Sequence, residues 1–390
     1  MLTEYTSPTD PEALFLSQMT LAVSPDNPRA RLLAARLYYS SLDTNSEKSA
    51  LHELEQAVKA SPNDYRIMLE LARALEQSGN SEAAKAAFQS AISLAPEYSI
   101  PHWQYGNYLI RAGETDEAIN QLRLAAKYNG NIREASLVAA WPLLGERPDL
   151  AAQLLPAQSD SFASLALFFA RQKLGKEALR FWNMLLPEEK KKFDYHGKTS
   201  LEALYKGQQY DSALEFAVQT GASTTSRLNA VTNPGFELPL PDQDIVYFDW
   251  QIRRGGRDVE VSLSRENPHS GTKALKIQFR GFKEQLIGQI AQLVAVTPGK
   301  RWRLKYWMRS SGLKGFAMPM LQIVEPGTSK LIAAGAPIVD SEMPWRQFEL
   351  EFTMPEDSQG FVIMLGREAC TEDCVISGNL WLDDLELEQV

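Results

Sequence analysis

The sequence predicts an α-solenoid of helical hairpins followed by an antiparallel β-sandwich. Three observations support this fold class. Pro28, Pro62 and Pro96 stand 34 residues apart, with two helical patterns between successive prolines. After residue 233 the helical period disappears, and short alternating runs separated by Pro, Gly and Asn replace it. Residues 301–309, RWRLKYWMR, alternate between apolar and mostly basic side chains with the period of two that a β-strand has.

The composition bounds the classes of function. The chain has 390 residues, is 44% hydrophobic and carries a formal net charge of −9. It is therefore long enough for two or three globular units, and its acidic balance argues against nucleic acid as a partner. It contains no apolar run of the roughly 20 residues that a membrane span needs. The first 15 residues do not read as a secretory signal, so we expect either a cytoplasmic protein or a chain that lacks its export segment.

The helical half begins with Asp10 and Pro11, an N-cap and first-turn pair that predicts a helix over 11–23. This helix falls in register with the second helix of a repeat, so it is either a cap or a cut through a longer array. In the later repeats, turns at glycine separate the two helices, and small residues stand where the helices cross closely. These small positions are Ala72, Ala84, Gly106 and Ala118. We interpret residues 131–156, 161–186 and 194–220 as degenerate repeats.

Over residues 28–130 the period and the residue positions resemble the tetratricopeptide repeat family. The resemblance implies a concave groove that holds a peptide or another protein. The alternative is that the helices only hold the β domain in place. The candidate groove residues lie on the first helices of the repeats and are Arg36, Arg73, Tyr105 and Asn107. We predict a solenoid over 1–222, a linker over 223–232 and a sandwich over 233–390.

The alternating runs after residue 233 predict eight to ten short strands. They cover 245–252, 257–263, 273–279, 286–296, 301–309, 316–324, 331–339, 346–353, 360–366 and 379–388. The segments NPGFE (233–237), GTKALKI (271–277), WRQFELEFTMP (345–355) and NLWLDDLEL (379–387), with 289–310, resemble the carbohydrate-binding-module jelly rolls of the galactose-binding-like superfamily. Many such modules bind no sugar, so the resemblance implies the fold more firmly than the ligand.

The same resemblance implies a structural Ca²⁺ between the opening segment and the last strand. Glu237 and Asp384 match the positions of its carboxylate ligands. The alternative is that both are ordinary surface acids. No other cofactor is expected.

A glycan surface needs aromatic rings for sugar C–H faces and polar groups for hydroxyls. The candidates are Trp307, Arg301, Arg303, Lys305, Arg309, Trp250 and Tyr247. We assign Trp302 and Trp381 to the core and Trp345 to a structural role. The four cations favour an acidic polysaccharide. In the alternative, Trp307 pairs with a neighbouring strand while Arg303 and Lys305 neutralise Glu349 and Glu351.

Cys370 and Cys374 are the two cysteines of the chain. Their spacing permits a small disulfide, which would indicate an oxidising compartment, and two free thiols are the alternative. The four histidines are scattered, so we expect no zinc site.

We expect no catalysis. The sequence has neither GxSxG nor HExxH, and GKTS at 197–200 lacks the earlier glycine of a phosphate-binding loop. Asp383 and Asp384 are adjacent in a predicted strand, so we expect them to face opposite ways.

The sequence therefore predicts a non-catalytic scaffold in bacterial cell-envelope or exopolysaccharide assembly, located in the periplasm or cell envelope. The solenoid would bind a protein partner and the jelly roll a glycan. Alternatives are a purely protein–protein adaptor whose jelly roll binds no sugar, and an accessory part of a separate glycosidase.

Overall fold

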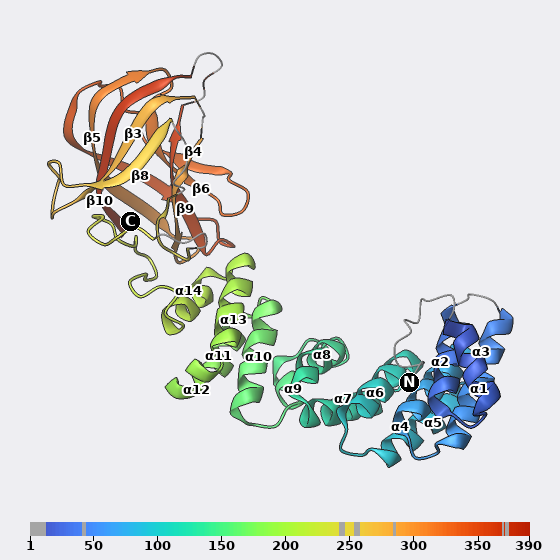
Figure 1. The fold of residues 1–390 in the computed structure, drawn as a ribbon. Helices are drawn as coiled ribbons and strands as arrows, with labels where there is room; N and C mark the ends of the chain where they lie inside the picture. The colour runs from blue at the N-terminus through green and yellow to red at the C-terminus, as the bar shows by residue number, and fades with distance from the viewer. Residues whose placement is uncertain are drawn as a thin grey trace. The chain divides into compact units, whose positions relative to one another are not determined.

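The computed structural model describes residues 13–40, 44–241, 246–252, 258–283, 286–368, 370 and 374–390. The chain divides into two compact units, Met1–Ser164 and Leu165–Val390, and the boundary falls inside helix α10 (Ser159–Arg171). Helices precede strands along the chain (Figure 1), which confirms the predicted fold class. No helix among the described residues is long and apolar enough to cross a bilayer.

The first unit consists of antiparallel helices joined by short turns. They are α1 (Ala13–Val23), α2 (Pro28–Ser40), α3 (Thr44–Ala60), α4 (Tyr65–Gln77), α5 (Ser81–Leu94), α6 (Ser99–Ala112), α7 (Thr115–Tyr128), α8 (Gly130–Ala140), α9 (Pro148–Ala152) and the first half of α10. The predicted start at Asp10 and Pro11 lies outside the described residues. The side chain of Asp64 accepts from the Arg66 N–H at the start of α4, and Gly113, with φ of 78°, ends α6.

Small side chains let the paired helices approach, as predicted. Ala72, Ala84 and Ala118 are fully buried. A Cβ atom on Gly106 of α6 would lie 3.1 Å from Leu122 Cδ2 of α7. Bulk at these positions would push the helices of a hairpin apart, so the repeat period reflects close packing.

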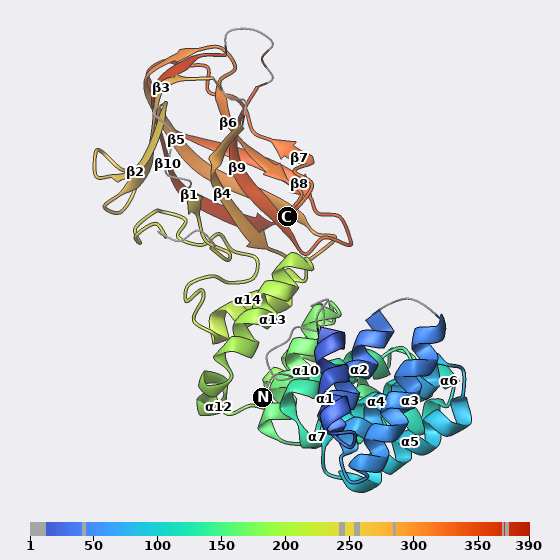
Figure 2. The same cartoon turned by 45° about the vertical axis from the view of Figure 1, so that its right-hand side comes forward.

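The second unit continues with α11 (Gly175–Trp182), α12 (Pro187–Lys192), α13 (Asp194–Lys206) and α14 (Tyr210–Gln219) and then forms two five-stranded antiparallel sheets. Sheet A has the order β1 (Gln251–Ile252), β4 (Leu286–Ala295), β9 (Gly360–Arg367), β6 (Pro319–Val324) and β7 (Leu331–Ala334). Sheet B has the order β2 (Val259–Ser264), β3 (Ala274–Phe282), β10 (Ile376–Gln389), β5 (Arg301–Gly315) and β8 (Met343–Thr353). The sheets lie face to face (Figure 2).

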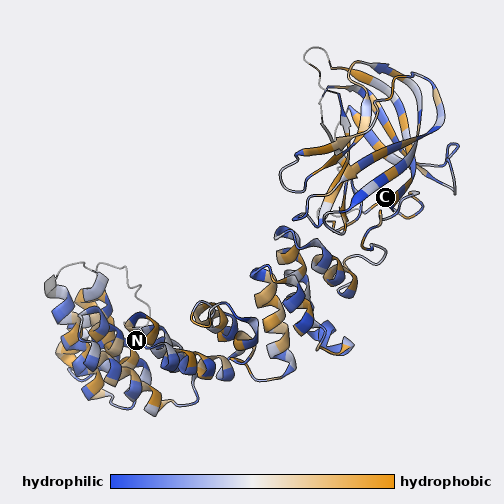
Figure 3. Cartoon of the chain, turned by 180° about the vertical axis from the view of Figure 1, so that it is seen from behind, coloured by the Kyte–Doolittle hydropathy of each residue, from blue (hydrophilic) through white to orange (hydrophobic). Residues whose placement is uncertain are grey.

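Strand β5 shows how the sequence pattern makes the sandwich. Trp302, Leu304, Tyr306 and Met308 are buried in the core between the sheets. The alternate residues, from Arg301 to Arg309, therefore lie on the outer face of sheet B. The same banding of hydrophilic and hydrophobic residues is visible along the strands in Figure 3.

Within the second unit, helices α13 and α14 pack against the β-sandwich. Tyr205 of α13 contacts Tyr247 and Phe248, with ring centroids 5.0 and 5.3 Å apart. Burial raises the pKa of the Tyr210 hydroxyl to about 12. The Asp211 N–H donates to Gln359 Oε1 over 3.4 Å.

The segment predicted as a linker is also held on the sandwich. Ser226 Oγ donates to the Phe248 carbonyl, and the Thr232 N–H donates to Gln292 Oε1. The predicted domain boundaries stay a prediction.

Candidate functional site

The candidate glycan surface lies on the outer face of sheet B, where β5 runs between β10 and β8. Across this face Arg303 stands opposite Glu351 of β8 and Glu388 of β10. Trp307 stands opposite Gln347 and Asp383. The predicted row of alternating β5 side chains is therefore present, with carboxylates on both flanking strands.

Three of the four predicted cations are paired with these carboxylates. Arg301 and Arg303 each contact Glu351 over 2.5 Å, and Lys305 Nζ lies 2.7 Å from Glu388 Oε1. The two guanidinium groups, Arg303 first, hold the pKa of the Glu351 carboxyl below its usual range. The predicted alternative named Glu349 and Glu351 as partners of Arg303 and Lys305. Glu351 does pair with Arg303, whereas Glu349 lies 4.0 Å from Arg303 and Lys305 pairs with Glu388 instead. This part of the face is a network of paired charges, which weakens the case for an acidic polysaccharide.

Trp307 is half-buried because a histidine covers it. The ring of His269 stacks on Trp307 with centroids 3.8 Å apart and planes 18° apart. His269 Nδ1 lies 2.6 Å from Asp384 Oδ2, which fixes the plane of the imidazole. Trp307 therefore presents less open ring surface than the sequence alternation suggests.

His269 belongs to the loop between β2 and β3, and we call residues 265–272 of this loop the strap. Side chains of sheet B hold the strap on the outer face. Trp345 Nε1 donates to the Asn267 carbonyl over 2.9 Å, and an Arg309 NH2 group donates to the Glu266 carbonyl over 2.9 Å. Lys276 Nζ lies 3.1 Å from the Glu266 carboxylate.

Beneath the strap, two tryptophans lie beside the cationic side chains of Arg309 and Lys276. They are Trp381, which was predicted to lie in the core, and Trp345, which was predicted to have a structural role. Arg309 Cζ lies 3.9 Å from the Trp381 ring centroid and 5.7 Å from that of Trp345, and Lys276 Nζ lies 4.9 Å from that of Trp381. Trp381 is only 2% exposed, as its core assignment predicted. Its neighbours Leu380 and Leu382 occupy the core, however, so Trp381 belongs to the outer face.

Two predicted glycan contacts lie away from this face, and the expected exposure of Trp250 is wrong, whereas Tyr247 is partly exposed. Trp250 is fully buried, packs on Phe236 with centroids 5.1 Å apart, and donates from Nε1 to the Asn233 carbonyl. Tyr247 packs on Tyr205 of α13. Residues 246–250 are not in a strand, so alternation could not show which way their side chains point.

A bulge in β10 arranges the acids near the strap. Asp384 has a φ of 48° where the register of β10 shifts, so it departs from strand alternation. Alternation predicted that Asp383 and Asp384 would face opposite ways. Because of the bulge, both carboxylates instead contact the strap. Asp383 Oδ2 accepts from the His269 N–H, while Asp384 Oδ1 accepts from Ser270 Oγ.

Glu237 holds the other end of the strap. Its carboxylate accepts from the N–H and hydroxyl of Thr272 over 2.7 and 2.6 Å and from the Lys273 N–H over 3.0 Å. These donors, the Thr272 hydroxyl first, lower the pKa of the Glu237 carboxyl. Gly271 has no Cβ, which would lie against the Glu237 carboxylate.

These contacts test whether the residues present fit the predicted calcium ion. Glu237 and Asp384 hold the same loop, but each carboxylate oxygen faces an N–H, an O–H or an imidazole nitrogen. The Lys273 ammonium also lies 2.7 Å from the Glu237 carbonyl. Among the described residues no group of three or more His, Cys, Asp or Glu side chains is arranged to hold a metal. In this arrangement the residues form a hydrogen-bonded latch without a metal, and the calcium ion stays a prediction.

Comparison with known families agrees with both halves of the fold. Residues 228–367 match the family described as Carbohydrate binding domain, and residues 42–97 match the family described as Tetratricopeptide repeat. This chain joins tetratricopeptide repeats to a carbohydrate-binding-type domain.

Several solved structures are similar to parts of the chain. A crystal structure of MamA is 18% identical, covers 51% of this chain and 90% of its own, and has a TM-score of 0.27. A structure titled "CBM4 structure and function" is 13% identical, with 41% and 100% covered and a TM-score of 0.32. The C-terminal part of a TPR repeat-containing protein from Cytophaga hutchinsonii is 14% identical, with 53% and 80% covered and a TM-score of 0.34. No curated protein matches the chain. Likenesses at these scores carry no functional argument.

In the tetratricopeptide repeats, the structure brings two of the four candidate groove residues together. Arg36 and Arg73 both contact the Glu70 carboxylate, over 2.7 and 2.5 Å. Asn107 donates to the Trp103 carbonyl of its own helix. Tyr105 is 3% exposed and stacks on Phe88 in the helical core, so its expected place on an open groove is wrong.

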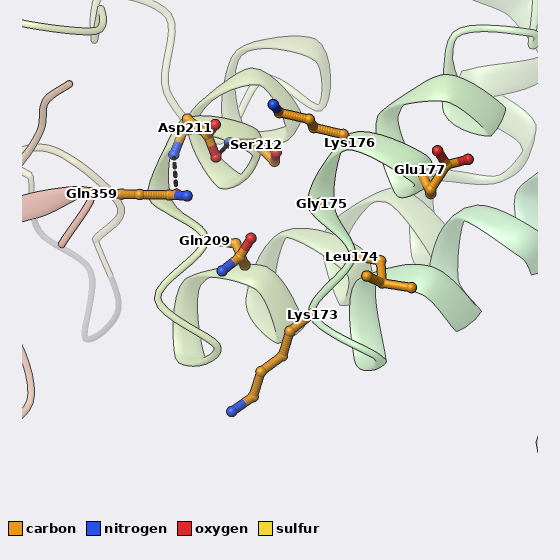
Figure 4. Close-up of a pocket in the computed structure, with 9 residues that line it drawn as sticks. All are labelled: Lys173, Leu174, Gly175, Lys176, Glu177, Gln209, Asp211, Ser212 and Gln359. Atoms are coloured by element: carbon orange, nitrogen blue, oxygen red, sulfur yellow. Dashed lines mark hydrogen bonds between the residues drawn. The ribbon is translucent and has the colours of Figure 1, made fainter. Parts of the chain in front are cut away.

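Described residues line a pocket in each unit, and the pocket of the first unit includes the groove candidate Tyr105. In the first unit a polar pocket of about 440 Å³ lies between α5, α6 and α7, lined by residues that include Lys85, Tyr105, Glu114 and Glu117. In the second unit a pocket of about 190 Å³ is lined by residues that include Lys173, Lys176, Asp211 and Gln359 (Figure 4). The helix turns at 173–177 and 209–212 form most of the second pocket.

In the carbohydrate-binding-type domain, a disulfide joins Cys370 and Cys374. An Arg367 NH2 group donates to the Cys374 carbonyl over 2.7 Å and also to the Phe316 carbonyl. The residues between the cysteines lie outside the described part of the chain.

Proposed function

We propose that this protein is a non-catalytic binding scaffold whose helical repeats hold a protein partner and whose carbohydrate-binding-type domain contacts a glycan. The matches to both families support a binding scaffold. The observation that carries the glycan half is the outer face of sheet B. There Trp307, Trp345 and Trp381 gather with Arg309 and Lys276. Sugar rings pack on aromatic side chains, and their hydroxyls accept hydrogen bonds from cationic donors beside those rings.

A glycan array probed with the full chain, followed by calorimetry on each hit, tests the glycan half. We expect at least one immobilised oligosaccharide to bind saturably. Absence of binding across neutral and acidic glycans would contradict it. Arg36→Ala with Arg73→Ala tests the repeat half, because these two candidate groove residues have side chains that are 53% and 47% exposed and meet at Glu70. Crosslinks between α2 or α4 and a partner should then be lost while the thermal midpoint stays unchanged.

A second candidate is a purely protein–protein adaptor whose sandwich binds no sugar. The paired charges of Arg301, Arg303 and Lys305 and the histidine over Trp307 favour it, because they leave little open glycan surface. In this case Trp307→Ala weakens a protein complex and changes no glycan binding.

For the location, we propose an oxidising compartment such as the periplasm or cell envelope, in an exopolysaccharide or envelope assembly. The Cys370–Cys374 disulfide supports this placement, since disulfides persist chiefly in such compartments. Thiol labelling of the protein in intact cells should find both cysteines unreactive until a reductant is added. Free, reactive thiols in the native host would place the protein in a reducing compartment.

A further inference from the structure

Three buried polar atoms on the outer face of sheet B have no hydrogen-bond partner. They are Trp381 Nε1, Arg309 Nε and Asn379 Oδ1. Trp381 and Arg309 are directly opposite one another on β10 and β5. Asn379 is two residues before Trp381 on β10, so both side chains point to the same face. Buried polar atoms without partners are uncommon in folded proteins, and three on one face need an explanation.

The chemistry of these atoms describes a ligand. Trp381 Nε1 and Arg309 Nε donate hydrogen bonds, and Asn379 Oδ1 accepts one. A sugar hydroxyl both donates and accepts, so adjacent hydroxyls satisfy all three atoms. A carboxylate would suit the two donors but would face the carbonyl oxygen of Asn379. The half-buried ring of Trp345 supplies a flat apolar surface beside them, since Arg309 and Lys276 already lie over the Trp381 ring.

The strap lies over Arg309 and Trp345, and its two halves are held differently. The contacts of Asp383, Asp384 and Glu237 with His269, Ser270 and Thr272 fix the second half, so the first half is the part that can lift. Single hydrogen bonds from Trp345 and Arg309 to strap carbonyls hold its first half. The Lys276–Glu266 ion pair is partly open to solvent, because the Glu266 side chain is 61% exposed. Residues 265–267 and 270–272 are exposed and belong to no strand, so lifting the strap breaks no β-sheet hydrogen bond.

We propose that Trp381, Arg309 and Asn379 form a subsite for a neutral glycan that the strap closes in the free protein and uncovers on binding. This inference rests on the proposed glycan function and adds the place, the ligand class and the gating element. His269 is the positioning residue of the closed state. It stacks on Trp307 and contacts Asp384, so it ties the strap to both β5 and β10.

The test uses the full chain and the neutral oligosaccharide that binds best on the array. Trp381→Phe keeps an aromatic ring but removes Nε1 together with the five-membered ring of the indole, and we expect it to weaken binding by tenfold or more. His269→Ala should strengthen binding by threefold or more, because the closed strap loses its anchor. Trp302→Phe is the matched control, since Trp302 Nε1 is also buried and unpaired but lies on the core side of β5. It should change affinity by less than twofold.

Each outcome decides one question. No binding of the wild-type chain to any glycan contradicts the proposed function itself. Binding that Trp381→Phe leaves unchanged places the glycan elsewhere and overturns the subsite. Tightest binding to a uronic acid oligomer overturns the neutral class. Should Trp381→Phe fail to fold, Arg309→Lys and the wild-type indole N–H resonance of Trp381 replace it. A resonance that does not move on titration with a bound glycan rejects the subsite.

Discussion

Asp383 shows how strongly one residue of this sandwich depends on its surroundings. Its carboxyl is fully buried and accepts N–H groups of His269 and Asp384. Burial, with the neighbouring charge of Asp384, raises its pKa to about 6. Because the folded-state pKa lies above the unfolded one, the folded protein favours the protonated form. The stabilising contribution is complete below about pH 4 and is lost as the pH rises through 6.

We therefore expect the second unit to lose roughly 2 kcal/mol of unfolding free energy between pH 4 and pH 7 through Asp383 alone. Urea unfolding of the wild type and of Asp383→Asn at several pH values measures this, because the difference between them isolates the group. The difference should vary with pH in that window and flatten above it. A constant difference would show that Asp383 titrates normally.

Gly197 shows a second residue-scale constraint. A Cβ atom there would lie 2.7 Å from two atoms of the Trp182 ring and 2.8 Å from Thr220 Cγ2. The glycine of the rejected GKTS motif thus has a packing reason to be there.

We expect Gly197→Ala to lower the unfolding free energy by about 1–3 kcal/mol, although alanine is the better helix former. Denaturant unfolding monitored by circular dichroism is the measurement. Gly130→Ala is the matched control, since the nearest atom to its added Cβ is an Arg133 nitrogen at 3.5 Å. It should cost less than about 0.5 kcal/mol.

At the scale of elements, the strap is the connection that the latch residues define. Glu237 and Asp384 fix it from the opening segment and the last strand. Since their carboxylates already have donors, the latch should not require a metal. Addition of EDTA is expected to leave the thermal midpoint of the second unit unchanged, whereas Glu237→Ala should lower it by several degrees because Thr272 and Lys273 lose their acceptor. A midpoint that falls with EDTA and recovers with Ca²⁺ would establish the calcium site.

The elements themselves could be predicted from the sequence because each carries a local period. The proline spacing and small residues gave the helical hairpins, and alternation gave the strands. Where local pattern ends, side-chain direction could not be predicted. Trp250 lies before β1, so nothing indicated that it enters the core. The bulge at Asp384 depends on contacts with a loop more than 100 residues away. For Trp381 the sequence did contain a signal of its direction. Leu380 and Leu382 on either side of it are core residues, so alternation indicates that Trp381 faces outward.

At the scale of the whole molecule, the two compact units should respond separately to substitutions in their cores. Tyr205 belongs to the second unit, where it packs on Tyr247 and Phe248, and Tyr105 belongs to the core of the first. We expect Tyr205→Ala to lower only one of two calorimetric unfolding transitions and Tyr105→Ala only the other, each by about 3 kcal/mol. A single transition that both variants shift equally would mean that the units unfold together.

Strand β8 is the last strand in the order of sheet B, so β8 is an edge strand. An exposed edge is a template on which another copy of a chain can add a strand, and charged side chains along it oppose that addition. Arg346, Glu349 and Glu351 project along β8, and Pro344 stands near its start. The same carboxylate that neutralises Arg301 and Arg303 therefore also helps protect the protein from edge-to-edge aggregation.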